Sequence, residues 1–178
     1  LEEYLINKNN NGINLSEYTH DTDLLPLLKI LVLLYADDTL LLANDHLSQQ
    51  KSLNDFMEFC TQWKLEVNRE KTKVIIFGGR NTNGYNFLIN GSNIEIVDSY
   101  KHLGIFISKT SNFNKAKKHL IDQADKALHC VYTRINNTQW PIDLTLKLFD
   151  HTKVPILTYS CEVWGFSNLD LIEQIHHK

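Results

Sequence analysis

Two adjacent aspartates, Asp37 and Asp38, are the residues of this chain best suited to chemistry. They stand between two apolar runs, 27–35 and 39–43. Carboxylate oxygens, together with water and phosphate oxygens, are the ligands that Mg²⁺ prefers. Neighbouring residues within a strand point to opposite faces, but at the tight turn of a hairpin both carboxylates can approach one polar cleft. The pattern therefore predicts a metal site, and an aspartate-rich turn without a ligand is the alternative.

The elements around the aspartates follow from hydrophobic spacing. The flanking runs are rich in Leu, Ile and Val and predict a buried β-hairpin. Between residues 47 and 63 the apolar residues recur at helical spacing, which predicts an amphipathic helix with one core face. That face consists of Leu53, Phe56, Met57, Cys60 and Trp63. Strands are expected next at 65–67 and 72–77, the second closed by a Gly-Gly pair.

The second half of the chain changes from strands to helices. Asn90-Gly91 supplies the positive φ angles of a type I′ turn and predicts a hairpin between 85–89 and 94–97. Residues 100–108 read as one further alternating strand. Helices are expected at 113–136, 143–152, 155–164 and from 169 onward.

Composition places the chain among folded proteins. It has 178 residues, 43% of them apolar and 22% charged, with a formal net charge of -3. This content excludes disorder for most of the chain and allows a real hydrophobic core. Three distant cysteines without metal-type spacing are expected to be free thiols in a reducing compartment.

Targeting signals are absent from the sequence. The longest apolar run is shorter than the roughly 18 residues that span a bilayer, and the acidic start is unlike a signal peptide. An intracellular location, in nucleus or cytoplasm, is expected. Because the first residue is Leu1 and residues 1–7 read like the end of a helix, a fragment of a longer protein is expected.

Charge is unevenly distributed along the chain. Residues 1–38 contain two lysines against seven acidic residues, whereas 99–121 contains five lysines and no acidic residue. The lysines are Lys101, Lys109, Lys115, Lys117 and Lys118. A basic stretch beside aromatic residues can meet a phosphate backbone, and a solvated helix face is the alternative.

Several segments together resemble a known family. Residues 31–43, Leu-Val-Leu-Leu-Tyr-Ala-Asp-Asp-Thr-Leu-Leu-Leu-Ala, resemble motif C, the metal-binding motif of reverse transcriptases. The helix that ends at Trp63 lies where the family has the helix before motif D. Residues 65–77, which follow it, are similar to motif D itself. Residues 100–108 resemble the Tyr-Leu-Gly strand before the thumb, and 155–165 a thumb-side sequence. In this order, they resemble non-LTR (LINE-type) retrotransposon reverse transcriptases along the whole chain.

The resemblance implies an α+β right-hand polymerase fold. Residues 1–108 would form a partial palm, an antiparallel sheet with a packed helix, and 109–178 an all-helical thumb. The implied reaction is RNA-directed DNA synthesis with two Mg²⁺ ions in the complete enzyme. The implied partners are an RNA template, a DNA primer and dNTP, with no membrane.

The resemblance also assigns roles near the aspartates. Asp37 would bind metal directly, and Asp38 would support it by ligation or by its field. Tyr35 would lie near the primer terminus, where Ala36 leaves space. Lys71 matches the motif D lysine, a candidate for protonating or electrostatically steadying the pyrophosphate, and a solvated strand-edge lysine is the alternative.

Two further assignments concern nucleic acid. Leu103-Gly104 matches the primer-grip turn, where a missing side chain lets backbone approach nucleic acid, and an ordinary β-bulge is the alternative. The five lysines of 99–121 are the candidates for contacts with the nucleic-acid backbone. His119 and His129 lack a paired acid or cysteine at ligand spacing. Trp140 and Trp164 are expected in the thumb core or at helix junctions rather than as base-stacking platforms.

The chain also departs from the family pattern. The upstream aspartate of motif A and the glutamine region of motif B are missing, and Asp21 and Asp23 lack the apolar strand of motif A. Lys64 stands where a Gly is usual. The isolated chain is therefore expected to have negligible polymerase activity. The rival interpretations are a non-catalytic nucleic-acid-binding or scaffold remnant, and a decaying product without function.

Overall fold

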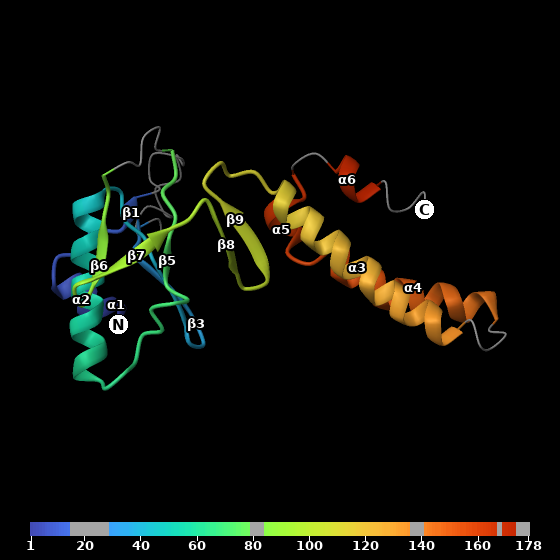
Figure 1. The fold of residues 1–178 in the computed structure, drawn as a ribbon, viewed down its shortest axis with the longest axis horizontal. Helices are drawn as coiled ribbons and strands as arrows, with labels where there is room; N and C mark the ends of the chain where they lie inside the picture. Colours follow the sequence, from blue (N-terminus) through green and yellow to red (C-terminus); the bar gives the residue numbers. More distant parts are fainter. Residues whose placement is uncertain (15–28, 79–83, 136–140, 167–168, 174–178) are drawn as a thin grey trace, which may run out of the picture. The chain divides into compact units, whose positions relative to one another are not determined.

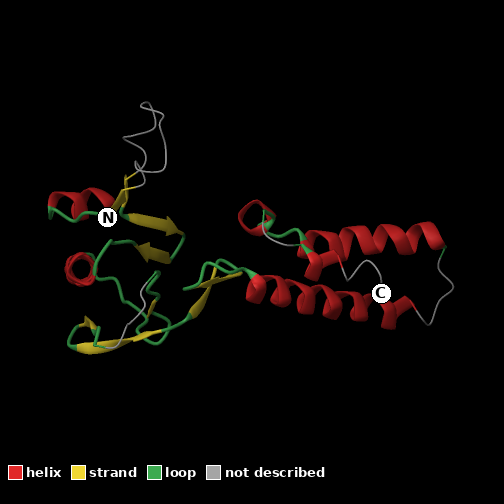
Figure 2. Cartoon of the chain, turned by 90° about the horizontal axis from the view of Figure 1, so that it is seen from above, coloured by secondary structure: helices red, strands yellow, loops and turns green. Residues whose placement is uncertain are grey.

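The computed structural model describes residues 1–14, 29–78, 84–135, 141–166 and 169–173 (Figures 1 and 2). The described chain is mixed α+β with small sheets. It divides into two compact units, Leu1–Val74 with Gly79–Ile96 and Ile75–Gly78 with Val97–Lys178. Expectations for Asp21, Asp23 and Trp140 lie outside the described residues.

The first unit combines two helices with short strands. Its elements are α1 (Glu2–Asn7), β1 (Ile13–Asn14), β2 (Lys29–Ile30), β3 (Val32–Tyr35), β4 (Asp38–Leu41), α2 (His46–Gln62), β5 (Lys73–Val74), β6 (Phe87–Ile89) and β7 (Ser92–Ile96). Three pairs are antiparallel, β1–β2, β3–β4 and β6–β7. The pair β5–β7 is parallel, so the expectation of a purely antiparallel sheet is wrong there.

The second unit begins with a hairpin and continues as helices. Its elements are β8 (Ser99–His102), β9 (Ile105–Ser108), α3 (Asn114–Ile135), α4 (Ile142–Leu157), α5 (Cys161–Trp164) and α6 (Asp170–Glu173). The long helices α3 and α4 pack side by side (Figures 1 and 2). Apolar burial holds this unit together in two clusters. These are Ile105, Ala116, Leu120 and Trp164, and Ala124 with Leu157.

The sequence predicted most helices and the Asn90-Gly91 hairpin correctly. The helix over 47–63 is α2. Its N-cap Asp45 accepts hydrogen bonds from the Ser48 hydroxyl at 2.6 Å and from the Ser48 backbone N–H at 2.9 Å, and these two bonds, in that order, lower the pKa of Asp45. Asn90 and Gly91 have φ of 48° and 74°, the signs that a type I′ turn requires.

Four local expectations are wrong. Residues 65–67 form no strand, and the strand expected at 72–77 is only the two-residue β5. Residues 100–108 form a hairpin rather than one strand. The expected break before Pro155 does not occur, since α4 continues through Pro155 to Leu157 although proline has no N–H for the i→i−4 hydrogen bond.

The base of the aspartate hairpin is fixed by a small core. Leu5 of α1 is fully buried and packs with Leu31 and Val32, which are 3% and 8% exposed. Polar contacts hold α1 against α2, since the buried Asn10 donates to Asp55 Oδ2 at 2.6 Å and accepts from Ser52 Oγ at 3.0 Å. The end of β3 that carries Val32 is therefore anchored by burial.

The helix α2 ends in a Schellman motif. The backbone N–H of Leu65 donates to the Cys60 carbonyl at 2.8 Å, and that of Lys64 donates to the Thr61 carbonyl at 3.3 Å. Lys64 occupies the left-handed position with φ of 56°. Glycine adopts this conformation without steric cost, which explains in physical terms why a Gly is usual where this chain has Lys64.

Replacing Lys64 by Gly is therefore expected to stabilise the chain by about 0.5–1 kcal/mol, because Gly adopts the left-handed conformation without the steric cost of a Cβ. Urea unfolding followed by circular dichroism measures the change. Lys64→Ala is the matched control, since it removes the long side chain but keeps the Cβ. Equal stability of the Gly and Ala variants would contradict this explanation.

Candidate functional site

The two aspartates lie at the tip of the hairpin formed by β3 and β4. The register pairs Val32 with Leu41 at the base and Tyr35 with Asp38 at the tip. The two-residue loop is therefore Ala36-Asp37, and Asp38 is the first residue of β4. Ala36 has φ of 50°, and a small side chain reduces the crowding at such a position. The expected hairpin is confirmed.

The expectation that this hairpin is buried is wrong. Leu33, Leu34 and Tyr35 are 48%, 55% and 66% exposed, and both aspartates are exposed. Only the base of the hairpin belongs to a hydrophobic cluster of the described residues. An exposed apolar hairpin of this kind is a surface suited to contact with another molecule or segment.

The chemistry of the tip fits a hard cation. Among the described residues neither the Asp37 nor the Asp38 carboxylate has a hydrogen-bond or ion-pair partner, so these oxygens are available as ligands. Within the same part of the chain no group of three or more His, Cys, Asp and Glu side chains could hold a metal ion. Asp37 and Asp38 would therefore supply part of a coordination shell that needs further oxygens.

Lys71 lies in a tight turn rather than on a strand edge. Its backbone N–H donates to Asn68 Oδ1 at 3.1 Å, and the Thr72 N–H donates to the Asn68 carbonyl at 3.0 Å. The Lys71 side chain is exposed. No hydrogen bond or ion pair joins Lys71 to either aspartate in the described structure.

Leu103 and Gly104 form the turn of the β8–β9 hairpin. Their φ angles are 46° and 86°, so the alternative of a β-bulge is wrong. The hydroxyl of Tyr159 donates to the Leu103 carbonyl at 2.7 Å. A Cβ on Gly104 would lie 3.1 Å from Tyr159 Cε1. A side chain at Gly104 would thus be strained by its backbone and crowded by Tyr159.

The five lysines of 99–121 differ in their surroundings. Lys117 is 1% exposed, and its Nζ lies 5.8 Å from the centre of the Trp164 ring. The expectation that Lys117 lies on the surface is therefore wrong, because its aliphatic chain packs inside the unit.

The other four lysines remain exposed. Lys109 pairs with Asp98 at 2.6 Å. Lys115 donates to Ser99 Oγ at 2.6 Å and lies 4.7 Å from the centre of the Phe106 ring. Lys118 is exposed without such a contact in the described structure, and Lys101 contacts His119.

Sequence reasoning missed His119. Its Nε2 lies 2.9 Å from Lys101 Nζ, and its ring makes an edge contact with Phe106 at 5.2 Å between centroids. Burial, followed by the neighbouring Lys101 charge, lowers the pKa of His119. No local signal could have found this pair, because its members belong to a strand and a helix 18 positions apart.

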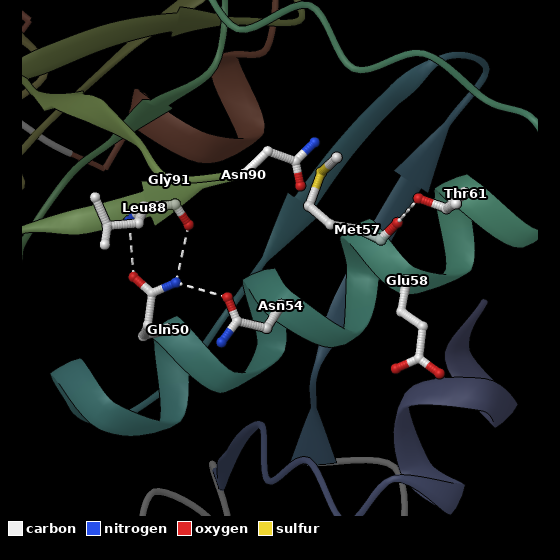
Figure 3. Close-up of a pocket in the computed structure, with 8 residues that line it drawn as sticks. All are labelled: Gln50, Asn54, Met57, Glu58, Thr61, Leu88, Asn90 and Gly91. Carbon is white, nitrogen blue, oxygen red and sulfur yellow. Dashed lines mark hydrogen bonds between the residues drawn. The ribbon is translucent and has the colours of Figure 1, made fainter.

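A polar cleft of about 480 Å³ lies in the first unit between α2 and the β6–β7 hairpin (Figure 3). The Gln50 amide donates to the Leu88 carbonyl and accepts from the Leu88 N–H, both at 2.8 Å. Gln50 also donates to Asn54 Oδ1 at 2.9 Å. The amide of Gln50 therefore closes the edge of β6 as a neighbouring strand would, which protects that edge from other chains.

In the described residues, the structure contains no helix that is long and apolar enough to cross a membrane.

Comparison with known proteins identifies the class. The family described as reverse transcriptase (RNA-dependent DNA polymerase) matches residues 6–134. The match covers well over half of the chain and includes the Asp37-Asp38 hairpin. The chain belongs to the reverse transcriptase family.

Particular relatives come from mobile elements. The chain is 25% identical over 155 residues to the RNA-directed DNA polymerase from mobile element jockey of Drosophila funebris, covering 78% of this chain and 16% of that protein. The jockey protein of Drosophila melanogaster is 26% identical over 152 residues, with the same coverage. A transposon-derived protein of Caenorhabditis elegans is 29% identical over 138 residues, covering 75% of this chain and 48% of that protein.

The chain thus spans about half or less of the length of these relatives. The predicted resemblance to LINE-type reverse transcriptases is confirmed as a distant relationship to jockey-type elements. No solved structure matches the chain.

Proposed function

We propose that this chain supplies the C-terminal part of the palm and the thumb of an RNA-directed DNA polymerase from a LINE-type element. The observation that carries the proposal is the Asp37-Asp38 pair at an exposed hairpin tip, within the residues matched to the reverse transcriptase family. The palm would extend over 1–108 and the thumb over 109–178. In the described part of the latter range, the regular elements are all helices, which supports the second assignment.

The Asp37 carboxylate is the proposed direct ligand of Mg²⁺, and Asp38 supports it by ligation or by its field. Mg²⁺ bound there would supply charge stabilisation to the oxygens of a phosphoryl transfer. The exposed Tyr35 beside the aspartates would lie near the primer end, and Ala36 leaves space there. Lys71 is the proposed electrostatic partner of the pyrophosphate.

The nucleic-acid contacts are proposed for the second unit. The Leu103-Gly104 turn would bring backbone close to the primer, since Gly104 has no side chain. The exposed Lys101, Lys109, Lys115 and Lys118 would contact phosphates of the RNA template and DNA primer. The buried Lys117 would act through packing instead of phosphate contact.

Metal binding at the hairpin has a direct test. Mn²⁺ is expected to broaden the backbone NMR signals of residues 35–39 in the purified chain, because a paramagnetic ion held by two carboxylates relaxes nearby nuclei. The double change Asp37→Asn and Asp38→Asn should abolish the broadening, whereas the exposed Glu66→Gln should leave it unchanged. Broadening that survives in the double variant would refute the assignment of these ligands.

Catalysis by the isolated chain is expected to be negligible. Two carboxylates without the third acidic residue of motif A form an incomplete Mg²⁺ site, and the motif B region of the nucleotide pocket is missing from the sequence. A primer-extension assay with an RNA template, dNTP and Mg²⁺ measures this. Extension by the wild-type chain that is lost in Asp37→Ala would overturn the expectation of inactivity.

A non-catalytic nucleic-acid-binding role is the second candidate, favoured by the exposed lysines of the second unit. Salt-dependent binding of a primer–template without extension is expected of both candidates, the polymerase part and the non-catalytic binding module. Mn²⁺ broadening at the hairpin distinguishes them, because a remnant that acts only as a binding module does not need the Asp37-Asp38 pair to hold metal.

A further inference from the structure

A second cleft, of about 420 Å³, lies within the second unit. Lys101 and Gly104 line it from the β8–β9 hairpin, and His119, Leu120 and Gln123 from α3. Pro155, Ile156 and Tyr159 close it from the end of α4 and the residues that follow. The cleft combines a basic corner with apolar walls, a combination that suits an anionic group attached to an organic body.

The frame of this cleft is held by specific contacts. The Tyr159 hydroxyl donates to the Leu103 carbonyl at 2.7 Å, which ties the hairpin turn to the end of α4. The hairpin and α3 are joined by the edge contact between Phe106 and His119. The basic corner, Lys101 and His119, is therefore positioned by contacts among the β8–β9 hairpin, α3 and the residues after α4, and not by one mobile side chain.

The contact between Lys101 and His119 defines a proton state. An ammonium group has no lone pair, so Lys101 Nζ donates and His119 Nε2 accepts across the 2.9 Å separation. The imidazole is then neutral and carries its proton on Nδ1. A second proton, added to Nε2, would break this hydrogen bond and place the imidazolium in contact with the Lys101 ammonium group.

Charged groups around His119 favour the neutral ring. Lys101 faces it from β8, and Lys126 and Asp122 act on it from α3, so that two cations oppose one carboxylate. The phenol of Tyr159 lines the cleft from the residues after α4. Burial and Lys101 lower the pKa of His119 more than Asp122 raises it.

We infer that this cleft binds a phosphodiester group of a nucleic-acid strand, and that His119 takes up one proton from solvent when the phosphate binds. A phosphate oxygen that replaces His119 Nε2 as the acceptor of the hydrogen bond from Lys101 Nζ leaves Nε2 free. The added negative charge favours the imidazolium, whose Nε2–H then donates a second, charge-assisted hydrogen bond to the phosphate. The inference rests on the proposed nucleic-acid-binding function and adds His119 to it.

The pH dependence has a definite sign. Burial and the Lys101 charge hold the pKa of free His119 below its ordinary value, and the bound phosphate raises this pKa. Affinity is therefore constant above the pKa of the complex, rises as pH falls through it, and becomes constant again below the pKa of the free chain. Each unit of difference between the two pKa values corresponds to about a tenfold change in affinity.

Fluorescence anisotropy of a labelled primer–template with the full chain tests the inference at constant ionic strength. Wild-type affinity is expected to rise about threefold or more between pH 8 and pH 6. His119→Gln should lose this rise in affinity. The control His129→Gln changes an exposed histidine of the same helix and should keep the rise. Lys101→Gln should weaken binding at both pH values.

NMR titration of the His119 ring in the wild-type chain provides a measurement that needs no variant to fold. The pKa of His119 should be higher with the oligonucleotide than without it. A free dNTP that raises this pKa equally at the same concentration would overturn the assignment to a nucleic-acid strand.

The outcomes separate the inference from the proposed function. Binding that persists with an unchanged pH rise in His119→Gln overturns the role of His119 and leaves nucleic-acid binding standing. Absence of binding by the wild-type chain at every pH contradicts both. Loss of the rise in His129→Gln as well would also overturn the assignment to His119.

Discussion

Replacing Gly12 by Ala is expected to destabilise the chain by about 2–3 kcal/mol, because the added methyl group would collide with backbone atoms that cannot rotate away. A Cβ on Gly12 would overlap the Ile30 carbonyl oxygen and lie 2.5 Å from Ile30 C and 2.6 Å from Leu31 Cα. Gly12 does not have a positive φ, so its backbone conformation alone would tolerate Ala. The expected cost is therefore a steric one.

The position of this collision makes the prediction relevant to the candidate site. Ile30 and Leu31 lead directly into β3, at the other end of which Ala36-Asp37 forms the hairpin loop. Displacement of Ile30 should change the NMR shifts of β3 as well as lower the free energy of unfolding. Both changes are measurable in the full chain, by NMR and by urea unfolding.

Gly91→Ala is the control for Gly12→Ala within the same unit. Gly91 has φ of 74° and open space where a Cβ would lie, so its replacement costs about 1 kcal/mol through backbone strain alone. The Gly91 variant should leave the signals of β3 unchanged. If Gly12→Ala is no more destabilising than Gly91→Ala, the close approach of Gly12 to Ile30 is not as described.

Local sequence was sufficient where a structural signal lies within a few neighbouring residues. Asn90-Gly91 contains two residues that tolerate positive φ, and the hairpin around it was predicted correctly. Leu103-Gly104 adopts the same signs of φ, but Leu is disfavoured in that conformation, so the sequence favoured a continuous strand. Tyr159, 56 positions away, holds the Leu103 carbonyl in the folded chain, and such tertiary support is invisible to local patterns.

Burial was harder to predict than secondary structure. The apolar hairpin around Asp37 was expected inside the protein, yet among its described residues only Leu31 and Val32 at the base are buried. By contrast Lys117, expected on the surface, packs beneath Trp164. Side-chain type sets the average burial of a residue, but the elements that cover it decide the individual case.

The candidate site also contains residues that the sequence could predict and residues that only the folded structure brings together. Asp37 and Asp38 could be predicted because their motif is contiguous and because one hairpin positions both residues. The proximity of Lys101 and His119 depends on the packing of β8 against α3, and neither residue stands in a recognisable metal or catalytic spacing. Contiguous motifs therefore revealed the metal candidate, while the proton-linked cleft required the folded arrangement.

Replacing Trp164 by Ala is expected to destabilise the second unit by about 3–5 kcal/mol, the cost of removing a large buried aromatic side chain. Trp164 is 3% exposed and packs with Ile105, Ala116 and Leu120. Its Nε1–H donates at 2.8 Å to the carbonyl of Tyr159, the same residue whose hydroxyl fixes the hairpin turn. Loss of the indole should therefore loosen the turn as well as the core.

Graded variants separate packing from surface recognition. Trp164→Phe keeps much of the apolar contact but loses the N–H donor, so its cost should be smaller, about 1–3 kcal/mol. Val163→Ala, at a neighbouring side chain that is 53% exposed, should change stability by less than about 0.5 kcal/mol. Urea unfolding by circular dichroism gives the order of the three variants in stability, and hydrogen exchange locates the loss of stability in the second unit.

If Trp164 were instead a base-stacking platform, Trp164→Ala would weaken oligonucleotide binding while leaving unfolding unchanged. The 3% exposure of Trp164 argues against that result in the folded chain, since a buried ring cannot stack on a base.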